Sequence, residues 1–310
     1  MRAWLQRGMA AARLGGDRSD LWPAGSLAAI AYLGWATLLL VMAPPNPDSW
    51  AFLAINLVTS GSFPFNVVAL AVAVVAGFAT LCLVAALGEV ALQRGASGPP
   101  DRMGATAPPP LSHEVLTGLS VNLVATLPAA AAAGALAVGI IDVAPAAFQS
   151  PDLATPVLVR VLLDVWPLLV LLVVATIVAQ AFGGVALRLA IGPGRRPVGR
   201  AIGDAARRIL RRPLPHLAVA LAGLLKDALS VLVTYALLRV LWAPISAELG
   251  RGRLIAPDTL LLLVGFVAIW LALLLAAGAL HVTISAWWAF ELGEPGGGKR
   301  PLDAAAPPAA

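Results

Sequence analysis

The stretch LLLLVGFVAIWLALLLAAGAL, residues 260–280, runs for 21 residues without a charged side chain. A helix needs about 20 mostly apolar residues to cross the roughly 30 Å hydrocarbon core of a bilayer. Three more blocks reach that length with a similar composition, namely 24–43, 67–92 and 115–141. The sequence therefore predicts an all-α membrane protein.

The composition of the whole chain agrees with these blocks. Of its 310 residues, 60% are hydrophobic and 12% are charged, whereas soluble domains are typically about 45–50% apolar and about 25% charged. We expect six transmembrane helices, arranged as three hairpins. Their expected bounds are 24–43, 66–92, 115–141, 156–191, 213–245 and 257–292. A cleavable signal peptide is the competing interpretation of the first block, since Val41-Met42-Ala43 resembles a cleavage site, but the block and its leader are long for one.

The positions of the basic residues predict the orientation of the spans. Arginines and one lysine lie in segments 2–18, 94–102, 195–212 and 299–300, whereas the segments 44–64 and 142–155 carry none. Only Arg251 and Arg253 fall on the opposite side of the membrane from these basic segments. Because basic residues are retained in the cytoplasm, we expect both termini there. The preference for Arg over Lys, together with abundant Ala, Gly and Pro, indicates a bacterial protein of the cytoplasmic (inner) membrane.

Three kinds of segment make up the expected organisation. Residues 1–22 form a cytoplasmic N-terminal segment, and residues 23–292 form the six-span transmembrane domain. Within that domain, 93–112 is a cytoplasmic linker and 195–212 holds an amphipathic helix. Residues 293–310 are expected to be a disordered cytoplasmic tail, because their Gly, Pro and Ala cannot bury enough apolar surface to fold alone.

The segment 198–212 is a basic amphipathic helix when it is placed on a helical wheel. Val198, Ile202, Ala205, Ala206 and Ile209 share one face. Such a helix lies in the membrane interface, and each arginine near an anionic leaflet contributes on the order of 1 kcal/mol. The candidate lipid-contact residues are Arg200, Arg207, Arg208, Arg211 and Arg212. A topology anchor and specific lipid or partner binding both remain open.

The fifth span carries the deepest ionisable residues. Lys226 lies 13 residues after Pro213, roughly 20 Å along a helix. Lys226, Asp227, Ser230 and Thr234 form a polar stripe that should face the bundle interior, because lipid cannot satisfy it. Neighbouring residues point about 100° apart on a helix, so we expect imperfect pairing of Lys226 with Asp227 and a contribution from His281 in the sixth span. A packing clasp and a proton- or solute-handling site are the two interpretations.

Other unusual residues in the spans have simpler interpretations. Glu89, Arg188 and Arg239 lie near span ends, where long side chains can reach the interface. Arg160 and Asp164 are four residues apart, a spacing that allows them to pair on one helix face. Gly134 and Gly139, with the alanine run 129–133, predict close helix packing in the third span.

A six-span layout of three hairpins with a basic amphipathic segment before the fifth span resembles the membrane region fused to some bacterial glycerophosphodiester phosphodiesterases. It is also similar to related stand-alone membrane proteins. That family often ends its last span with an aromatic residue, an acid, Leu and Arg. Here Phe290-Glu291-Leu292 matches, and Gly293 replaces the Arg. The phosphodiesterase domain is absent from this chain, so the resemblance implies no catalytic residue.

The sequence has no recognisable catalytic signature. It contains no His-Glu-x-x-His, no Gly-x-Ser-x-Gly and no phosphate-binding P-loop. We therefore expect a non-enzymatic membrane protein without metal or cofactor, acting in membrane or envelope organisation. Its expected partners are membrane lipids with anionic headgroups and not nucleic acid. The alternatives are a transporter or permease subunit with a polar site in the fifth span, and an intramembrane enzyme with acids and histidines converging on one pocket.

Overall fold

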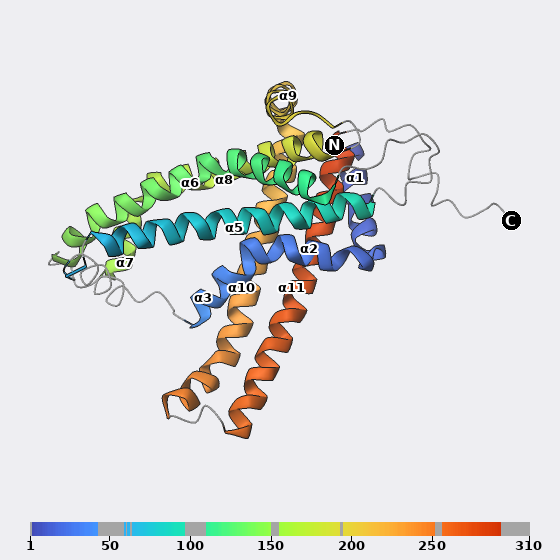
Figure 1. Cartoon of the computed structure of the whole chain (residues 1–310). Coiled ribbons are helices and arrows are strands. Elements are labelled where there is room, and N and C mark those ends of the chain that lie inside the picture. Colours follow the sequence, from blue (N-terminus) through green and yellow to red (C-terminus); the bar gives the residue numbers. More distant parts are fainter. Residues whose placement is uncertain are drawn as a thin grey trace.

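The computed structural model describes residues 2–42, 59, 61–62, 64–96, 110–149, 155–192, 195–251 and 256–292. Throughout these residues the regular structure is helical, which confirms the all-α prediction (Figure 1). Five of the helices, α5, α6, α8, α10 and α11, are long and apolar enough to cross a membrane. The elements are α1 (Arg2–Asp17), the 3-10 turn η1 (Ser19–Leu21), α2 (Trp22–Ala29), the π-helical turn η2 (Ile30–Gly34), α3 (Trp35–Met42), α5 (Phe65–Ala96), α6 (Leu111–Gln149), α7 (Val157–Asp164), α8 (Trp166–Ile191), α9 (Val198–Arg211), α10 (Pro213–Gly250) and α11 (Pro257–Leu292).

The first apolar block is helical but divided. Helices α2 and α3 are joined by η2, so that helical structure runs without a break from Trp22 to Met42. None of the three pieces has the length of a span by itself, which is why the long apolar helices number five among the described residues. The expected tail 293–310 and most of the linker 93–112 lie outside the described residues.

Several expected boundaries are wrong. The fourth segment is two helices, because the chain bends at Val165, two residues before Pro167. Helix α6 continues past Asp142 to Gln149, where a loop was expected. Within the expected N-terminal segment 1–22, α1 is a helix that packs on α11. From the sequence, Pro128, Pro167 and Pro244 are each expected to kink a span or mark its end, but Pro128 and Pro244 lie inside continuous helices and do not end them.

The long helices form two groups that cross steeply (Figure 1). Helices α5, α6 and α8 lie side by side in one group, and α10 and α11 form the other as an antiparallel hairpin. Helix α2 lies between α5 and α11, and α3 packs on α10. We call the end of the molecule where α8 and α11 end and α10 begins the basic end, because α9 lies there.

The largest buried cluster of the protein is at this basic end. It joins the last turns of α8 to the first turns of α10, and it includes Val185, Ala186, Val219 and Trp288. Towards the other end the long helices expose their apolar side chains. They include Val75 at 67%, Val138 at 67%, Val240 at 73% and Leu261 at 74% exposed. Such surfaces are costly in water and are those expected of helices that face lipid.

Of the two glycines expected to allow close packing, only Gly139 does so, since a Cβ there would lie 2.5 Å from the Leu168 side chain of α8. A Cβ on Gly134 would meet nothing within 4 Å, so that glycine lies open. In contrast, a Cβ on Gly278 would lie 2.6 Å from the backbone oxygen of Trp22 and 2.6 Å from the backbone nitrogen of Ser26. Helices α2 and α11 therefore approach each other almost backbone to backbone. Small residues permit this approach in membrane helices.

Candidate functional site

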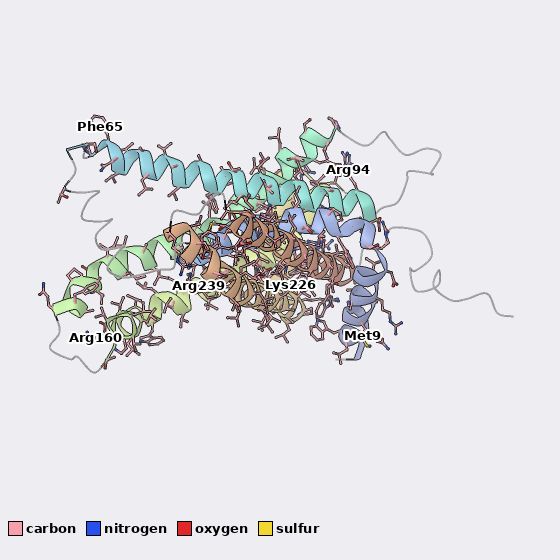
Figure 2. The ribbon with its side chains drawn as sticks, turned by 90° about the horizontal axis from the view of Figure 1, so that it is seen from below. Met9, Phe65, Arg94, Arg160, Lys226 and Arg239 are labelled. Atoms are coloured by element: carbon pink, nitrogen blue, oxygen red, sulfur yellow. The ribbon has the colours of Figure 1, made fainter. Side chains whose placement is uncertain are left out.

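Lys226 lies within the bundle, near the centre of Figure 2. Its side chain is 9% exposed. The ammonium Nζ is 2.6 Å from Asp227 Oδ1 and 3.4 Å from His281 Nδ1. The structure thus brings these three expected residues together. Lys226 and Asp227 pair closely despite their different directions on the helix, contrary to expectation, because the four-carbon lysine stem can curl towards its neighbour.

His281 extends this contact to α5. Its Nε2 is 2.7 Å from Glu89 Oε1, and the Ser285 hydroxyl donates to Glu89 Oε2 over 3.3 Å. The sequence suggested that Glu89 reaches out to the membrane interface, but in the structure it does not. Its side chain is only 14% exposed and faces α11.

Arg188 is likewise directed inwards. Its guanidinium lies 3.7 Å from Glu89 Oε2 and donates to the Ser285 carbonyl oxygen at 3.0 Å and the Ser285 hydroxyl at 2.7 Å. It also donates to the Gly184 carbonyl oxygen at 2.9 Å. With 6% of its side chain exposed, this arginine is almost fully paired. The expectation that it reaches the interface is therefore wrong.

Gln180 of α8 completes the set by donating to Asp227 Oδ2 at 3.4 Å. Together these side chains form one connected group, which we call the polar network. It contains two carboxylates, one lysine, one arginine and one histidine, so its charges sum to zero when the two carboxylates, the lysine and the arginine are ionised and the histidine is neutral. Its members are Glu89, Gln180, Arg188, Lys226, Asp227, His281 and Ser285.

Two expected members of the stripe lie outside this network. Thr234 is buried and Ser230 is half-buried, but among the described residues neither is hydrogen-bonded to the polar network. The sequence did contain a clue to the members that were missed. The segments Gly88–Leu92 and Gly184–Arg188 end the second and fourth spans in similar ways, and each carries one ionisable residue at the same end of the bundle.

Helix α9 presents a strongly basic outer surface. Arg200, Arg207, Arg211 and Arg212 are exposed there, and Arg208 is half-buried and donates to the Leu292 carbonyl oxygen at 3.5 Å. The segment expected to form an amphipathic helix is helical over Val198–Arg211. On its inner face, Ala201 and Ala205 are fully buried against the core cluster of the basic end. Ile202 and Ala206, which were expected on the apolar face, are half-buried.

A second carboxylate at the basic end is held by two arginines. Glu114, whose side chain is 6% exposed, accepts from Arg94 at 2.7 Å and from Arg195 at 2.6 Å. This clamp ties the start of α6 to the end of α5 and to the segment before α9.

At the opposite end, the expected pair of Arg160 with Asp164 does not form within the described residues, and Arg160 Nε and Nη1 are buried without a hydrogen-bond partner.

The chemistry that these groups offer is ion pairing and hydrogen bonding. No group of three or more His, Cys, Asp or Glu side chains within the described ranges could hold a metal ion. Two shallow hollows on the helices are lined by apolar side chains, one of them between α3 and α10 at Leu40, Val231 and Tyr235.

No protein-family model, curated protein or solved structure matches the chain.

Proposed function

We propose that the chain is a six-span protein of the bacterial cytoplasmic membrane with its basic end and both termini in the cytoplasm. Helical structure over Trp22–Met42 supports a sixth span, because 21 residues cover about 30 Å. The basic residues support the orientation. Arg7, Arg94 and Arg195 pair with carboxylates at one end of the molecule, and positive charge is retained in the cytoplasm.

We further propose that the basic end binds anionic lipid headgroups. The observation that supports this proposal most directly is the junction of α9 and α10. There Leu210 is 81% and Leu214 is 79% exposed, beside the exposed Arg211 and Arg212. Exposed leucines next to arginines fit the boundary between headgroups and acyl chains, which takes apolar side chains on one side and cations on the other.

Helix α1 supports the same interpretation. Its inner face packs on α11, where the rings of Trp4 and Trp287 lie 4.8 Å apart. Its outer face exposes Leu5 at 50% and Met9 at 57%, and Met9 lies at the edge of the molecule in Figure 2. Arg13 is exposed nearby. Two helices at the basic end thus combine outward apolar side chains with arginines.

From these surfaces we infer a non-enzymatic protein that acts in membrane or envelope organisation by contact with anionic lipid. The test compares the retention of phosphatidylglycerol and phosphatidylcholine by the purified full chain, measured by native mass spectrometry. We expect stronger retention of the anionic lipid. Each arginine near such a surface contributes on the order of 1 kcal/mol, so changing Arg200, Arg207, Arg211 and Arg212 to Gln should lower the preference at least about tenfold.

The matched control is Arg251→Gln, which removes an exposed arginine from the opposite end. It should leave the lipid preference unchanged. Added salt should weaken retention by the unaltered protein, because screening shortens the reach of exposed charges. Equal retention of both lipids, or a quadruple variant that keeps the preference, would show that the basic surface has no lipid role.

A transporter or permease subunit is the second candidate, and the polar network is the observation that favours it. Buried ionisable residues in membrane helices often mark ion or proton pathways. The test is proton flux into liposomes that contain the full chain, followed with an internal pH-sensitive dye. Flux above that of protein-free liposomes, lost in the Lys226→Met/Asp227→Leu variant, would favour transport. Flux equal to that of protein-free liposomes would reject proton transport.

A further inference from the structure

His281 uses both ring nitrogens within the bundle, and the chemistry of its two partners fixes the position of its proton. Glu89 Oε1 lies 2.7 Å from Nε2, and a carboxylate only accepts hydrogen bonds, so Nε2 carries the hydrogen. Lys226 Nζ lies 3.4 Å from Nδ1, and an ammonium only donates, so Nδ1 carries the lone pair. The geometry thus selects the neutral imidazole with its hydrogen on Nε2.

The ammonium form of Lys226 is itself fixed by its second partner. Its Nζ lies 2.6 Å from the Asp227 carboxylate, and Gln180 holds the other oxygen of that carboxylate. The charge of Lys226 is therefore balanced on its own helix. The contact with His281 is an additional hydrogen bond that joins α10 to α11.

The surroundings of His281 define what a further proton would meet. Helix α5 contributes Glu89, α8 contributes Arg188, and α10 contributes Lys226 and Asp227. Helix α2 contains no ionisable residue. Arg7 of α1 pairs with Glu291 of α11, ten residues along the chain from His281. A protonated ring would thus lie between the carboxylate of Glu89 and the ammonium of Lys226.

We propose that His281 is a proton-binding site, and that proton binding at Nδ1 and the Lys226–His281 contact exclude each other. A proton taken from water forms a new N–H bond at Nδ1. Two donors then face each other, so the hydrogen bond between Lys226 and His281 breaks. Lys226 remains with Asp227, and the imidazolium remains with Glu89. Acidification therefore removes one bond between α10 and α11, and this holds whether the protein organises membranes or transports solutes.

The first experiment is nitrogen NMR of the full chain in lipid nanodiscs with isotope-labelled histidine. His281→Gln identifies its signals among the three histidines. We expect the Nε2–H tautomer at neutral pH and a second N–H bond on acidification. Lys226→Met removes the donor that faces Nδ1, so in this variant the second N–H bond should form on acidification without breaking a hydrogen bond to α10. His113→Gln, which changes an exposed histidine at the start of α6, is the control and should shift nothing.

The second experiment measures the separation of α10 and α11 with spin labels at the exposed positions Leu229 and Leu275, after Cys82→Ala removes the native thiol. The distance should lengthen as His281 takes its proton, and it should be independent of pH in His281→Gln. The Nδ1–H tautomer at neutral pH, or protonation without any change in separation, would overturn the proposal. If Lys226→Met does not fold, these two measurements on the unaltered side chains decide alone.

Discussion

Replacing Gly278 by alanine should separate two helices that now touch through their backbones. The new Cβ would lie 2.6 Å from the Trp22 carbonyl oxygen and 2.6 Å from the Ser26 amide nitrogen. Carbon atoms pack at about 3.5–4.0 Å, so α2 and α11 must move apart by roughly 1 Å. These two atoms belong to the backbone of a helix and cannot rotate away, and the Ser26 hydroxyl is a third close neighbour. The strain therefore falls at the upper end of the usual range for overpacking, about 3 kcal/mol.

The helix propensity of alanine offsets about 1 kcal/mol of that strain. The expected net loss in the free energy of unfolding is therefore about 2 kcal/mol. Gly265→Ala is the matched control, because it makes the same change in the same helix where a Cβ would meet nothing within 4 Å. That variant should gain about 0.5–1 kcal/mol.

Both variants can be compared by unfolding in mixed micelles with increasing sodium dodecyl sulfate, followed by circular dichroism and tryptophan fluorescence. The difference between the two alanine variants should be about 3 kcal/mol, with opposite signs relative to the unaltered chain. If Gly278→Ala is as stable as Gly265→Ala, the close approach of α2 and α11 is not a feature of the folded protein.

The remaining predictions concern topology and the polar network. Truncated fusions to a reporter after Leu92 and after Ala190 should report cytoplasm, and a fusion after Gln149 should report the external side. A cytoplasmic signal at Gln149 would reject the six-span topology. Lys226→Met should lower the free energy of unfolding by about 1–3 kcal/mol, because it leaves the half-buried Asp227 carboxylate without its ion pair. The Lys226→Met/Asp227→Leu variant should lose less in the same titration, and a larger loss would show that the pair does not act as one unit.

Long apolar helices could be predicted from the sequence because their formation is decided locally. The sixth expected segment and α11 share the bounds 257–292, and the basic amphipathic segment contains α9. In a bilayer every backbone group must be satisfied within its own segment, so length and hydropathy alone identify such helices. The bend at Val165 agrees with the prediction that Pro167 kinks the fourth span or marks its end, because proline at that position cannot continue a helix from the preceding turn.

The polar network could not be predicted in full because it depends on contacts between distant segments. Glu89 and His281 are 192 residues apart in the chain. Near the end of a span, a charged side chain can either reach the interface or turn inwards, and local sequence does not distinguish these directions. The same holds for α1, whose position depends on the contact of Trp4 with Trp287.

The wide π-helical turn η2 changes the angular phase of the first apolar block. Ala29, Leu33, Thr37 and Val41 are all buried and follow one another at intervals of four. In a regular α-helix each such step drifts by about 40°, which adds up to about 120° over three steps. A π turn rotates less per residue because it holds more residues, so η2 removes part of this drift. This one stripe of buried side chains can therefore pack on α11 where it runs along α2, and on α10 where it runs along α3.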